Sequence, residues 1–288
     1  MRVVRLRAAG GPEQLAVEDA PQPRPGPAEA LVRVHAAAIT RGELDWPVDR
    51  LPAIPSYELS GVVEEVGPGV SGLAPGDEVF ALTPFDRDGV AAEFASVPAE
   101  LLVPRPRTLG HAESAAIPLP ALSAWQALFD HGRLGAHDRV LIHGAAGSVG
   151  GFAVQLARAA GANVIGTASA ASLDLVRELG AREAVDAGED VAHTADLVVD
   201  TVGGERLRRS RAALRAGGRL VSVAEEPPEG GVFFIVEPNA EQLGSLARMV
   251  DAGGLRPPRV ERFPLTEARA AFARSLEPGR RGKAVLTV

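Results

Sequence analysis

Residues 140–157 read VLIHGAAGSVGGFAVQLA, and this stretch decides the fold. An apolar run leads into three spaced glycines, Gly144, Gly147 and Gly150, and apolar residues then recur at helical spacing. The pattern predicts a strand, a tight turn and a helix that begins at the turn. In such a turn a diphosphate can approach backbone N–H groups at a helix N-terminus, where the helix dipole favours negative charge. We therefore expect a dinucleotide site; the alternative is a turn that binds nothing.

The next strand, NVIGTAS at 163–169, indicates which dinucleotide binds. NAD-binding folds commonly place Asp or Glu about twenty residues past the glycines, on the ribose hydroxyls. Here Thr167 and Ser169 stand at the strand end without an acid, and hydroxyls accept a 2′-phosphate that a carboxylate would repel. The sequence favours NADPH over NADH, although Ser169 can also cap the following helix. The turn residues expected to contact the cofactor are Gly144, Ala145, Ala146, Gly147, Ser148, Val149 and Gly150.

The chain changes character along its length. Short apolar runs between Pro and Gly turns predict a β-barrel-like domain at 1–112, to which 240–288 returns with a last strand, GKAVLTV. Between 113 and 239, strand and helix patterns alternate, which is typical of a parallel sheet covered on both faces. We expect an α/β protein with helices in HAESAAIPLPALSAWQALFDHG and RLRRSRAALRAGG, and a buried strand in VFFIVEP.

Composition narrows the class of protein. The formal charge of −7 gives no reason to expect nucleic acid or an anionic membrane as a partner. The chain has no Cys, which excludes disulfides and zinc–thiolate sites, and Lys283 is its only lysine. Neither a signal peptide nor a membrane-spanning stretch is expected. We expect a cytoplasmic enzyme.

Several segments together resemble the zinc-independent quinone oxidoreductases of the medium-chain dehydrogenase/reductase superfamily. They are GGPEQLAVEDAPQPRPGPAEALVRVHAA, SGVVEEVGPGVSGLAPGDEVF, AAEFASVPAELL, AAIPLPALSAWQAL, VLIHGAAGSVGGFAVQLA, VVDTVGG, GGRLVSV and RGKAVLTV. The resemblance implies a GroES-like barrel, a Rossmann domain and NAD(P)H in the cleft between them. It also implies that no metal is bound, because Thr40 and Tyr57 stand where zinc-dependent members carry a Cys and a His.

Without a metal, hydrogen-bond donors must stabilise the charge that develops on a carbonyl oxygen, and one donor is worth about 3 kcal/mol. The resemblance makes Tyr57, Thr40 and Arg41 the catalytic candidates. Tyr57 can alternatively be a packed aromatic, Arg41 can be a solvated or phosphate-binding residue, and Glu58 is expected to hold the barrel together. Further cofactor contacts implied by the resemblance are Ser123, Thr201, Val202, Gly203, Val223, Phe234 and Val236.

We expect an NADPH-dependent reductase of quinones or α,β-unsaturated carbonyls. The resemblance also implies a homodimer, formed when the strand that carries Phe234 pairs across a two-fold axis. Two alternatives stay open: a narrower enoyl or alkenal reductase, and a non-catalytic NADPH-binding sensor or structural protein of the same fold.

Overall fold

The computed structural model describes residues 1–46, 49–191, 194–227 and 230–288. The chain folds into two compact units. The first comprises Met1–Pro118, Pro238–Asp251 and Pro257–Val288, and the second comprises Leu119–Glu237 and Ala252–Arg256. Relative to the expected boundaries, residues 113–118 and 238–239 therefore group with the first unit, and residues 252–256 group with the second.

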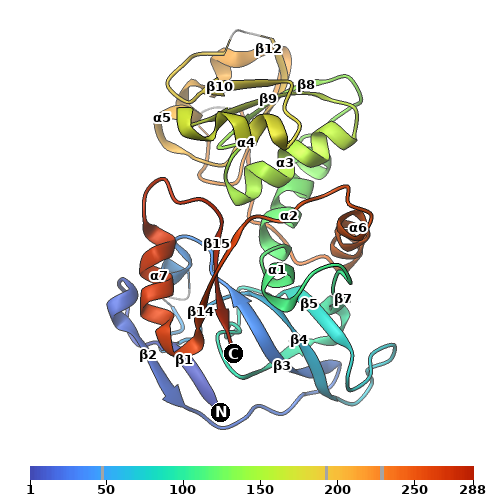
Figure 1. Cartoon of the computed structure of the whole chain (residues 1–288), viewed down its shortest axis with the longest axis vertical. Helices are drawn as coiled ribbons and strands as arrows, with labels where there is room; N and C mark the ends of the chain where they lie inside the picture. The colour runs from blue at the N-terminus through green and yellow to red at the C-terminus, as the bar shows by residue number, and fades with distance from the viewer. Residues whose placement is uncertain (47–48, 192–193, 228–229) are drawn as a thin grey trace. The chain divides into compact units, whose positions relative to one another are not determined.

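The first unit is a GroES-like β domain (Figure 1). Its main sheet has the order β14-β15-β3-β4-β5-β7, with β6 also paired to β3, and β1 pairs separately with β2. The last strand runs antiparallel to β3, with Val285 opposite Ala38, so the expected return of the C-terminus to this sheet is confirmed. The strands are β1 (Arg2–Leu6), β2 (Leu15–Asp19), β3 (Glu29–Ala38), β4 (Glu58–Val66), β5 (Glu78–Leu82), β6 (Phe94–Pro98), β7 (Val103–Pro104), β14 (Val260–Pro264) and β15 (Lys283–Thr287).

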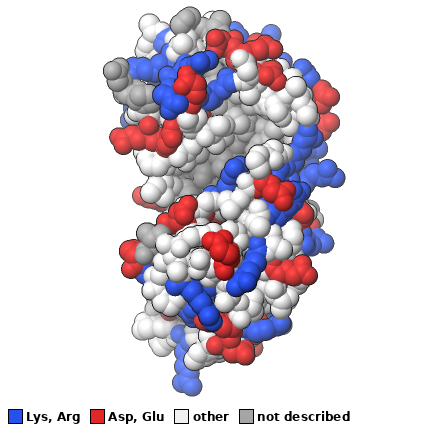
Figure 2. Space-filling view, turned by 90° about the vertical axis from the view of Figure 1, so that its left-hand side faces the viewer, with Lys and Arg blue, Asp and Glu red and all other residues white. Residues whose placement is uncertain are grey.

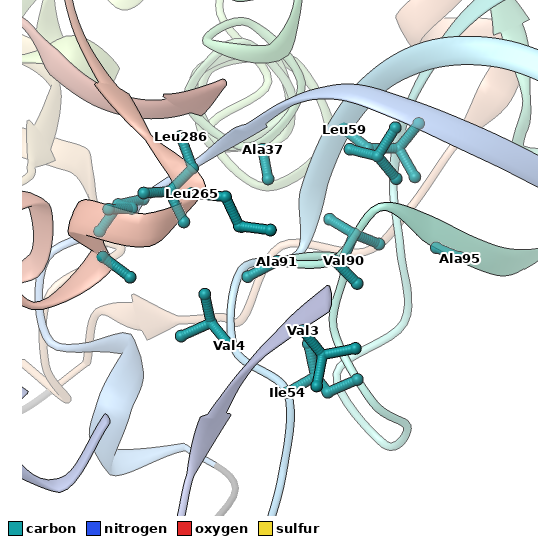
Figure 3. Close-up of a cluster of buried hydrophobic side chains, with 14 of the residues drawn as sticks. Val3, Val4, Ala37, Ile54, Leu59, Val90, Ala91, Ala95, Leu265 and Leu286 are labelled. Carbon is teal, nitrogen blue, oxygen red and sulfur yellow. The ribbon is translucent and has the colours of Figure 1, made fainter. Parts of the chain in front are cut away.

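Figure 3 shows the apolar core of this unit, which joins segments that are far apart in the sequence. Val3 and Val4 of β1 meet Val90 from a central loop and Leu265 and Leu286 from the C-terminal part, and all are at most 2% exposed. Burial of apolar surface stabilises a fold by about 25 cal/mol per Å², so this shared core fixes both ends of the chain to the barrel. The helices of the unit are α1 (His111–Ala115), α6 (Ala240–Asp251) and α7 (Ala268–Leu276).

The second unit contains a parallel sheet with the order β10-β9-β8-β11-β12-β13. In Figure 1, α3 and α4 lie in front of this sheet, and on the other face Leu207 of α5 packs with Leu141 and Val198. This is the doubly covered arrangement expected for a Rossmann-like domain. The strands are β8 (Arg139–His143), β9 (Asn163–Ala168), β10 (Glu183–Asp186), β11 (Ala195–Asp200), β12 (Leu214–Ser222) and β13 (Val232–Phe233). The helices are α2 (Pro118–Trp125), α3 (Ser148–Ala159), α4 (Leu173–Glu178) and α5 (Gly204–Arg209).

Two expected helical regions are shorter or more broken than the sequence patterns predict. The expectation for 206–218 is wrong beyond Ala213, because the α-helix ends at Arg209, a 3-10 turn follows and β12 begins at Leu214. Leu214 pairs with Ala195 of β11, and Gly217 has φ +76°, a backbone conformation that no helix contains. Residues 111–132 are helical as expected, but they are divided into α1, α2 and a π-helical segment, Gln126–His131, without a side-chain cap at the start of α1.

The expected buried strand at 232–238 is also wrong. Only Val232 and Phe233 form a strand, and they are 42% and 41% exposed. Ile235 is 67% exposed. Because β13 is the last strand of the sheet, one of its edges has no neighbouring strand among the described residues. The apolar composition that predicts burial here marks an exposed sheet edge instead.

On the face shown in Figure 2, acidic and basic side chains are interspersed and form no extended area of one sign. Among the described residues, no helix has the length and apolar character needed to cross a bilayer.

Candidate functional site

The glycine turn after β8 leaves no room for side chains at two of its positions. Gly144 has φ +73°, and a Cβ atom there would lie 2.5 Å from Thr201 Oγ1. A Cβ on Gly150 would lie 2.2 Å from the carbonyl oxygen of Gly144. The turn is therefore as tight as the sequence predicts, and α3 begins directly after it at Ser148. The backbone N–H groups of a helix N-terminus are left for a ligand to accept from.

Hydrogen bonds tie this turn to the ends of the neighbouring strands. Ala145 N donates to Thr167 O of β9 at 2.9 Å, and Thr201 Oγ1, after β11, donates to His143 O at 2.8 Å. The ends of three parallel strands thus meet around one turn, the position at which dinucleotides bind in such sheets. The glycines let the turn close tightly, and the first N–H groups of α3 are the ones that a diphosphate could bind.

The loop after β11 is held by a buried carboxylate. Asp200 Oδ2 accepts hydrogen bonds from Gly203 N at 2.8 Å and from Ser222 Oγ at 3.3 Å. Burial raises the pKa of Asp200, while these hydrogen bonds oppose the rise. The carboxylate connects the ends of β11 and β12 and so fixes the loop that contains Thr201, Val202 and Gly203.

The two hydroxyls at the end of β9 have different environments. Thr167 is 1% exposed, and its Oγ1 lies 2.9 Å from His143 Nδ1 inside the unit. Ser169 is exposed, and its Oγ contacts Ser172 Oγ at 3.2 Å without capping the backbone. Arg177, further along, pairs with Asp174 at 2.8 Å. Ser169 is therefore the accessible hydroxyl at this strand end.

The other expected cofactor contacts are spread over the second unit. Ser123 and Val236 are buried, Val223 is half-buried and Val202 is 58% exposed. The ring of Phe234 lies 4.2 Å from that of His131, centroid to centroid.

Tyr57, in the first unit, belongs to an aromatic cluster directly before β4. Its ring centroid lies 5.8 Å from that of Trp46 and 5.1 Å from that of Phe85. Tyr57 is 1% exposed, and its hydroxyl makes no hydrogen bond of ordinary geometry among the described residues, although the Arg50 guanidinium lies near enough to interact with it. Burial raises the pKa of this phenol, whereas the nearby Arg50 guanidinium opposes the rise. A buried O–H group without a well-formed hydrogen bond costs free energy, so this hydroxyl is an unsatisfied donor.

A buried polar network lies next to the segment that carries Tyr57, around Glu58, Lys283 and Thr40. Glu58 is fully buried and forms an ion pair with Lys283 Nζ of β15. Thr40 Oγ1 donates to Glu58 Oε1 at 3.1 Å and accepts from Lys283 Nζ at 3.3 Å. The expectation that Glu58 holds the barrel together agrees with this ion pair, which joins β4 to the C-terminal strand.

Thr40, Arg41 and Tyr57 are thus placed differently. The Thr40 hydroxyl is already engaged by Glu58 and Lys283, and Arg41 is exposed to solvent. The cation near the phenol of Tyr57 is Arg50, which donates to Phe85 O.

Comparisons with known proteins agree with this architecture. Residues 26–107 match the alcohol dehydrogenase GroES-like domain family, and residues 179–286 match the zinc-binding dehydrogenase family. A probable zinc-binding mitochondrial oxidoreductase from Arthroderma benhamiae is 34% identical, with 93% of this chain and 92% of the relative covered. The quinone oxidoreductase of Rattus norvegicus is 31% identical, with 99% and 97% covered. The structure of the quinone oxidoreductase from Coxiella burnetii matches with a TM-score of 0.93 and 28% identity, covering 100% of this chain and 99% of that one.

The chain belongs to the quinone oxidoreductase-like members of the medium-chain dehydrogenase/reductase superfamily. It is an oxidoreductase, and members of this superfamily use NAD(P) cofactors. The glycine turn of the second unit is the part of this medium-chain oxidoreductase that fits the diphosphate of such a cofactor.

At the positions where the resemblance places metal ligands of zinc-dependent members, this oxidoreductase carries Thr40 and Tyr57. Thr40 and Tyr57 offer hydroxyl groups there, whereas zinc sites are built from Cys, His and carboxylate ligands. In the described parts of the chain, His, Asp and Glu side chains nowhere gather in a group of three or more able to hold a metal ion.

Sequence reasoning did not identify the residues that surround Tyr57 in this oxidoreductase. Glu43 is 1% exposed beside Ser56, and Arg50 lies near the phenol. One signal was available, because a chain that uses arginine almost everywhere keeps its single lysine at position 283. Lysine has a compact ammonium group on a flexible stem, and here it fits the buried position beside Glu58.

Proposed function

We propose that this protein is an NADPH-dependent reductase of quinones or α,β-unsaturated carbonyls that works without a metal ion. The observation that carries the proposal is the buried hydroxyl of Tyr57, which makes no hydrogen bond of ordinary geometry among the described residues. Its ring is fixed between Trp46 and Phe85, so the hydroxyl is preorganised to donate to a carbonyl oxygen of the acceptor.

This set of donors suits an acceptor that is easily reduced. When bound, the reduced nicotinamide supplies the hydride that adds to an electrophilic carbon of the acceptor. Negative charge then grows on the acceptor oxygen, where Tyr57 donates a hydrogen bond and Arg50 adds a positive charge nearby. The oxygen takes its proton from solvent. Simple alcohols require a strong base and a Lewis acid, so we expect them to be poor substrates.

Ser169 supports the choice of NADPH. Its exposed hydroxyl stands at the end of β9, where NAD-binding folds commonly carry an acid. Ser148, Val149 and Gly150, at the start of α3, are proposed to hold the diphosphate, together with the Gly144–Gly147 turn.

A spectrophotometric assay of NADPH oxidation tests the proposal. The acceptors are 1,4-benzoquinone, 9,10-phenanthrenequinone and an alkenal, and the variants are Tyr57→Phe and, as a matched aromatic change in the other unit, Phe129→Leu. We expect turnover with the quinones, and for Tyr57→Phe a fall in kcat of about 100-fold, the loss typical of one donor to an oxyanion. The affinity of the Tyr57→Phe variant for NADPH should equal that of the wild type.

Three results would contradict parts of this proposal. NADPH binding without oxidation by any acceptor would favour the non-catalytic sensor. Turnover restricted to the alkenal would favour the narrower enoyl or alkenal reductase. Full turnover by Tyr57→Phe would remove the phenol from the mechanism while leaving the rest intact.

We further propose a homodimer formed through the edge strand β13. The observation in its favour is the exposed apolar surface of Val232, Phe233 and Ile235 on a sheet edge without a neighbouring strand among the described residues. Light scattering after size exclusion should give twice the mass of the chain, and Ile235→Glu should give the monomer. A monomeric wild type would refute the proposal. A cytoplasmic location stays a prediction.

A further inference from the structure

Glu43 is a buried carboxyl group that the reaction outlined above does not use. It lies in a 3-10 turn, Glu43–Asp45, and is 1% exposed. Its Oε2 accepts a hydrogen bond from Thr40 N at 3.0 Å, and its Oε1 lies 3.4 Å from Ser56 Oγ. One of its oxygens thus faces the residue directly before Tyr57.

Among the described residues, the cation that acts on Glu43 is already paired with another carboxylate. The charged groups that act on it are Lys283 from β15 and Glu58 from β4. Lys283 forms its ion pair with Glu58, and the described residues offer Glu43 no ion pair of its own. The buried carboxyl groups of Glu43 and Glu58 therefore have one ammonium group between them. An ionised, unpaired carboxylate in this interior would be strongly unfavourable.

Ser56 is buried and has a backbone conformation that is unfavourable for a residue with a side chain. It is fully buried and has φ +65°, in the left-handed region that costs a non-glycine residue about 1–2 kcal/mol. Ser56 O accepts from Val90 N at 2.7 Å, and Tyr57 O accepts from Thr83 N at 2.7 Å, so this backbone is held on both sides. The hydroxyl of Ser56 is what a glycine at this position would lack, and its neighbour is Glu43 Oε1.

We propose that Glu43 is a positioning residue that acts as a neutral acid: its Oε1–H donates to Ser56 and so holds the Tyr57 segment in its working conformation. Because Oε2 accepts from Thr40 N, the acid proton belongs on Oε1, the oxygen that faces Ser56. Loss of this proton leaves the Ser56 hydroxyl as the only possible donor of this bond, and it places an unpaired negative charge beside the segment that carries the phenol. This inference rests on the proposed role of Tyr57.

Two further observations agree with a neutral acid that still exchanges its proton with water. Burial raises the pKa of Glu43 to about 8, although Thr40 N and the charge of Lys283 act in the opposite direction. A cavity of about 140 Å³ adjoins Glu43, with Gly10, Gly11, Gly42, Phe272 and Leu276 among its lining residues. The cavity is large enough to admit water to the carboxyl group.

The first test compares pH profiles of quinone reduction for Glu43→Gln, Ser56→Ala and the wild type. Gln stays neutral and keeps an N–H donor at every pH, so Glu43→Gln should keep its kcat at alkaline pH. Above pH 8 we expect wild-type kcat to fall about tenfold per pH unit, as for one essential proton, and Glu43→Gln to show no such fall. Glu64→Gln, an exposed change on β4, is the matched control and should keep the wild-type profile. Ser56→Ala should lower kcat at pH 7 without raising KM.

The second test does not require turnover, and it separates failure of this inference from failure of the proposed function. Trp46 N donates to Glu43 O at 3.2 Å, and the Trp46 ring packs on Tyr57. In a Trp125→Phe background, Trp46 fluorescence should change with a midpoint near pH 8, and the Glu43→Gln variant should abolish this change. Equal profiles for wild type and Glu43→Gln, in kinetics or in fluorescence, would overturn the inference. If Trp46 fluorescence changes near pH 8 as expected but the protein has no reductase activity, only the proposed function would be refuted.

Discussion

The glycine turn and the Tyr57 segment are two polar regions built in opposite ways. The turn is made of backbone, and the residues that shape it, Gly144 to Gly150, are neighbours in sequence. The Tyr57 segment is made of side chains from remote places, such as Glu58 and Lys283, which are 225 positions apart. The difference teaches that a site made of backbone requires glycines at particular positions, because side chains there would clash. A network of side chains instead requires that folding brings oppositely charged groups together.

The strongest test of the side-chain region is Lys283→Met, which leaves Glu58 buried without its cation. Removing one partner of a buried ion pair costs about 3–5 kcal/mol, because the remaining charge keeps its desolvation penalty. We expect the first unit to unfold at a clearly lower urea concentration, followed by far-UV circular dichroism.

The double variant Glu58→Gln with Lys283→Met provides the control, since it removes both charges. It should recover most of the lost stability. If Lys283→Met alone unfolds at the wild-type urea concentration, the ion pair does not stabilise the barrel. The Tyr57 segment would then not depend on paired charges.

The strongest test of the backbone region is Gly150→Ala. The added Cβ would lie 2.2 Å from Gly144 O, so the turn must move, and we expect NADPH affinity to fall at least about 100-fold, or about 3 kcal/mol. Fluorescence titration with NADPH measures the change.

Gly151→Ala is the matched control one residue further along α3. Its Cβ would meet Leu179 Cδ1 at 3.4 Å, an ordinary contact, and alanine favours a helix by about 0.5–1 kcal/mol. Wild-type NADPH affinity is expected. Equal losses in both variants would show that the helix, and not the turn, governs binding.

The contrast also explains what the sequence predicted well. The β8–turn–α3 unit was predicted correctly because glycine spacing and apolar periodicity are local signals. The ends of the chain were harder, but GKAVLTV has the alternating pattern of a strand, and it pairs with β3 as expected.

The remaining errors come from tertiary context. Residues 214–218 look helical by composition, yet Leu214 joins β12 because a partner strand, β11, lies beside it. The run from Val232 to Val236 is apolar enough for a core, but the sheet ends there and leaves it exposed. Glu43 could not be assigned from sequence, because its environment depends on residues 40, 56 and 283 coming together.

A smaller effect should come from two stacked histidines in the first unit, another side-chain arrangement. The rings of His35 and His111 lie 4.5 Å apart, and Ser60 Oγ lies 2.8 Å from His111 Nδ1. Burial, His35 and Arg105 lower the pKa of His111 from 6.5 to about 4. His111 is thus neutral in the folded chain between pH 4 and 6.5, where the unfolded chain binds a proton. Stability is present above pH 6.5 and is lost as the pH falls toward 4.

His111→Gln removes this proton uptake. Because solvent screens a half-buried group, we expect it to reduce the acid loss of stability by only about 1–2 kcal/mol. Urea unfolding at pH 7 and pH 4.5 measures the difference, and the exposed His131→Gln serves as control. A wild type equally stable at both pH values would contradict the prediction.

The smallest expected effect returns to the glycine-turn side of the comparison, at Ser169. Its hydroxyl contacts only Ser172 Oγ among the described residues, at 3.2 Å, so little of the fold depends on it. If the Ser169 hydroxyl donates a hydrogen bond to the 2′-phosphate, Ser169→Ala should lower the ratio of NADPH affinity to NADH affinity about fivefold. This factor corresponds to about 1 kcal/mol for one hydrogen bond. Ser172→Ala, which is buried, should leave the ratio unchanged. A preference of the wild type for NADH would show that this strand end does not choose the cofactor. Even the backbone-built region would then depend on side chains elsewhere for its specificity.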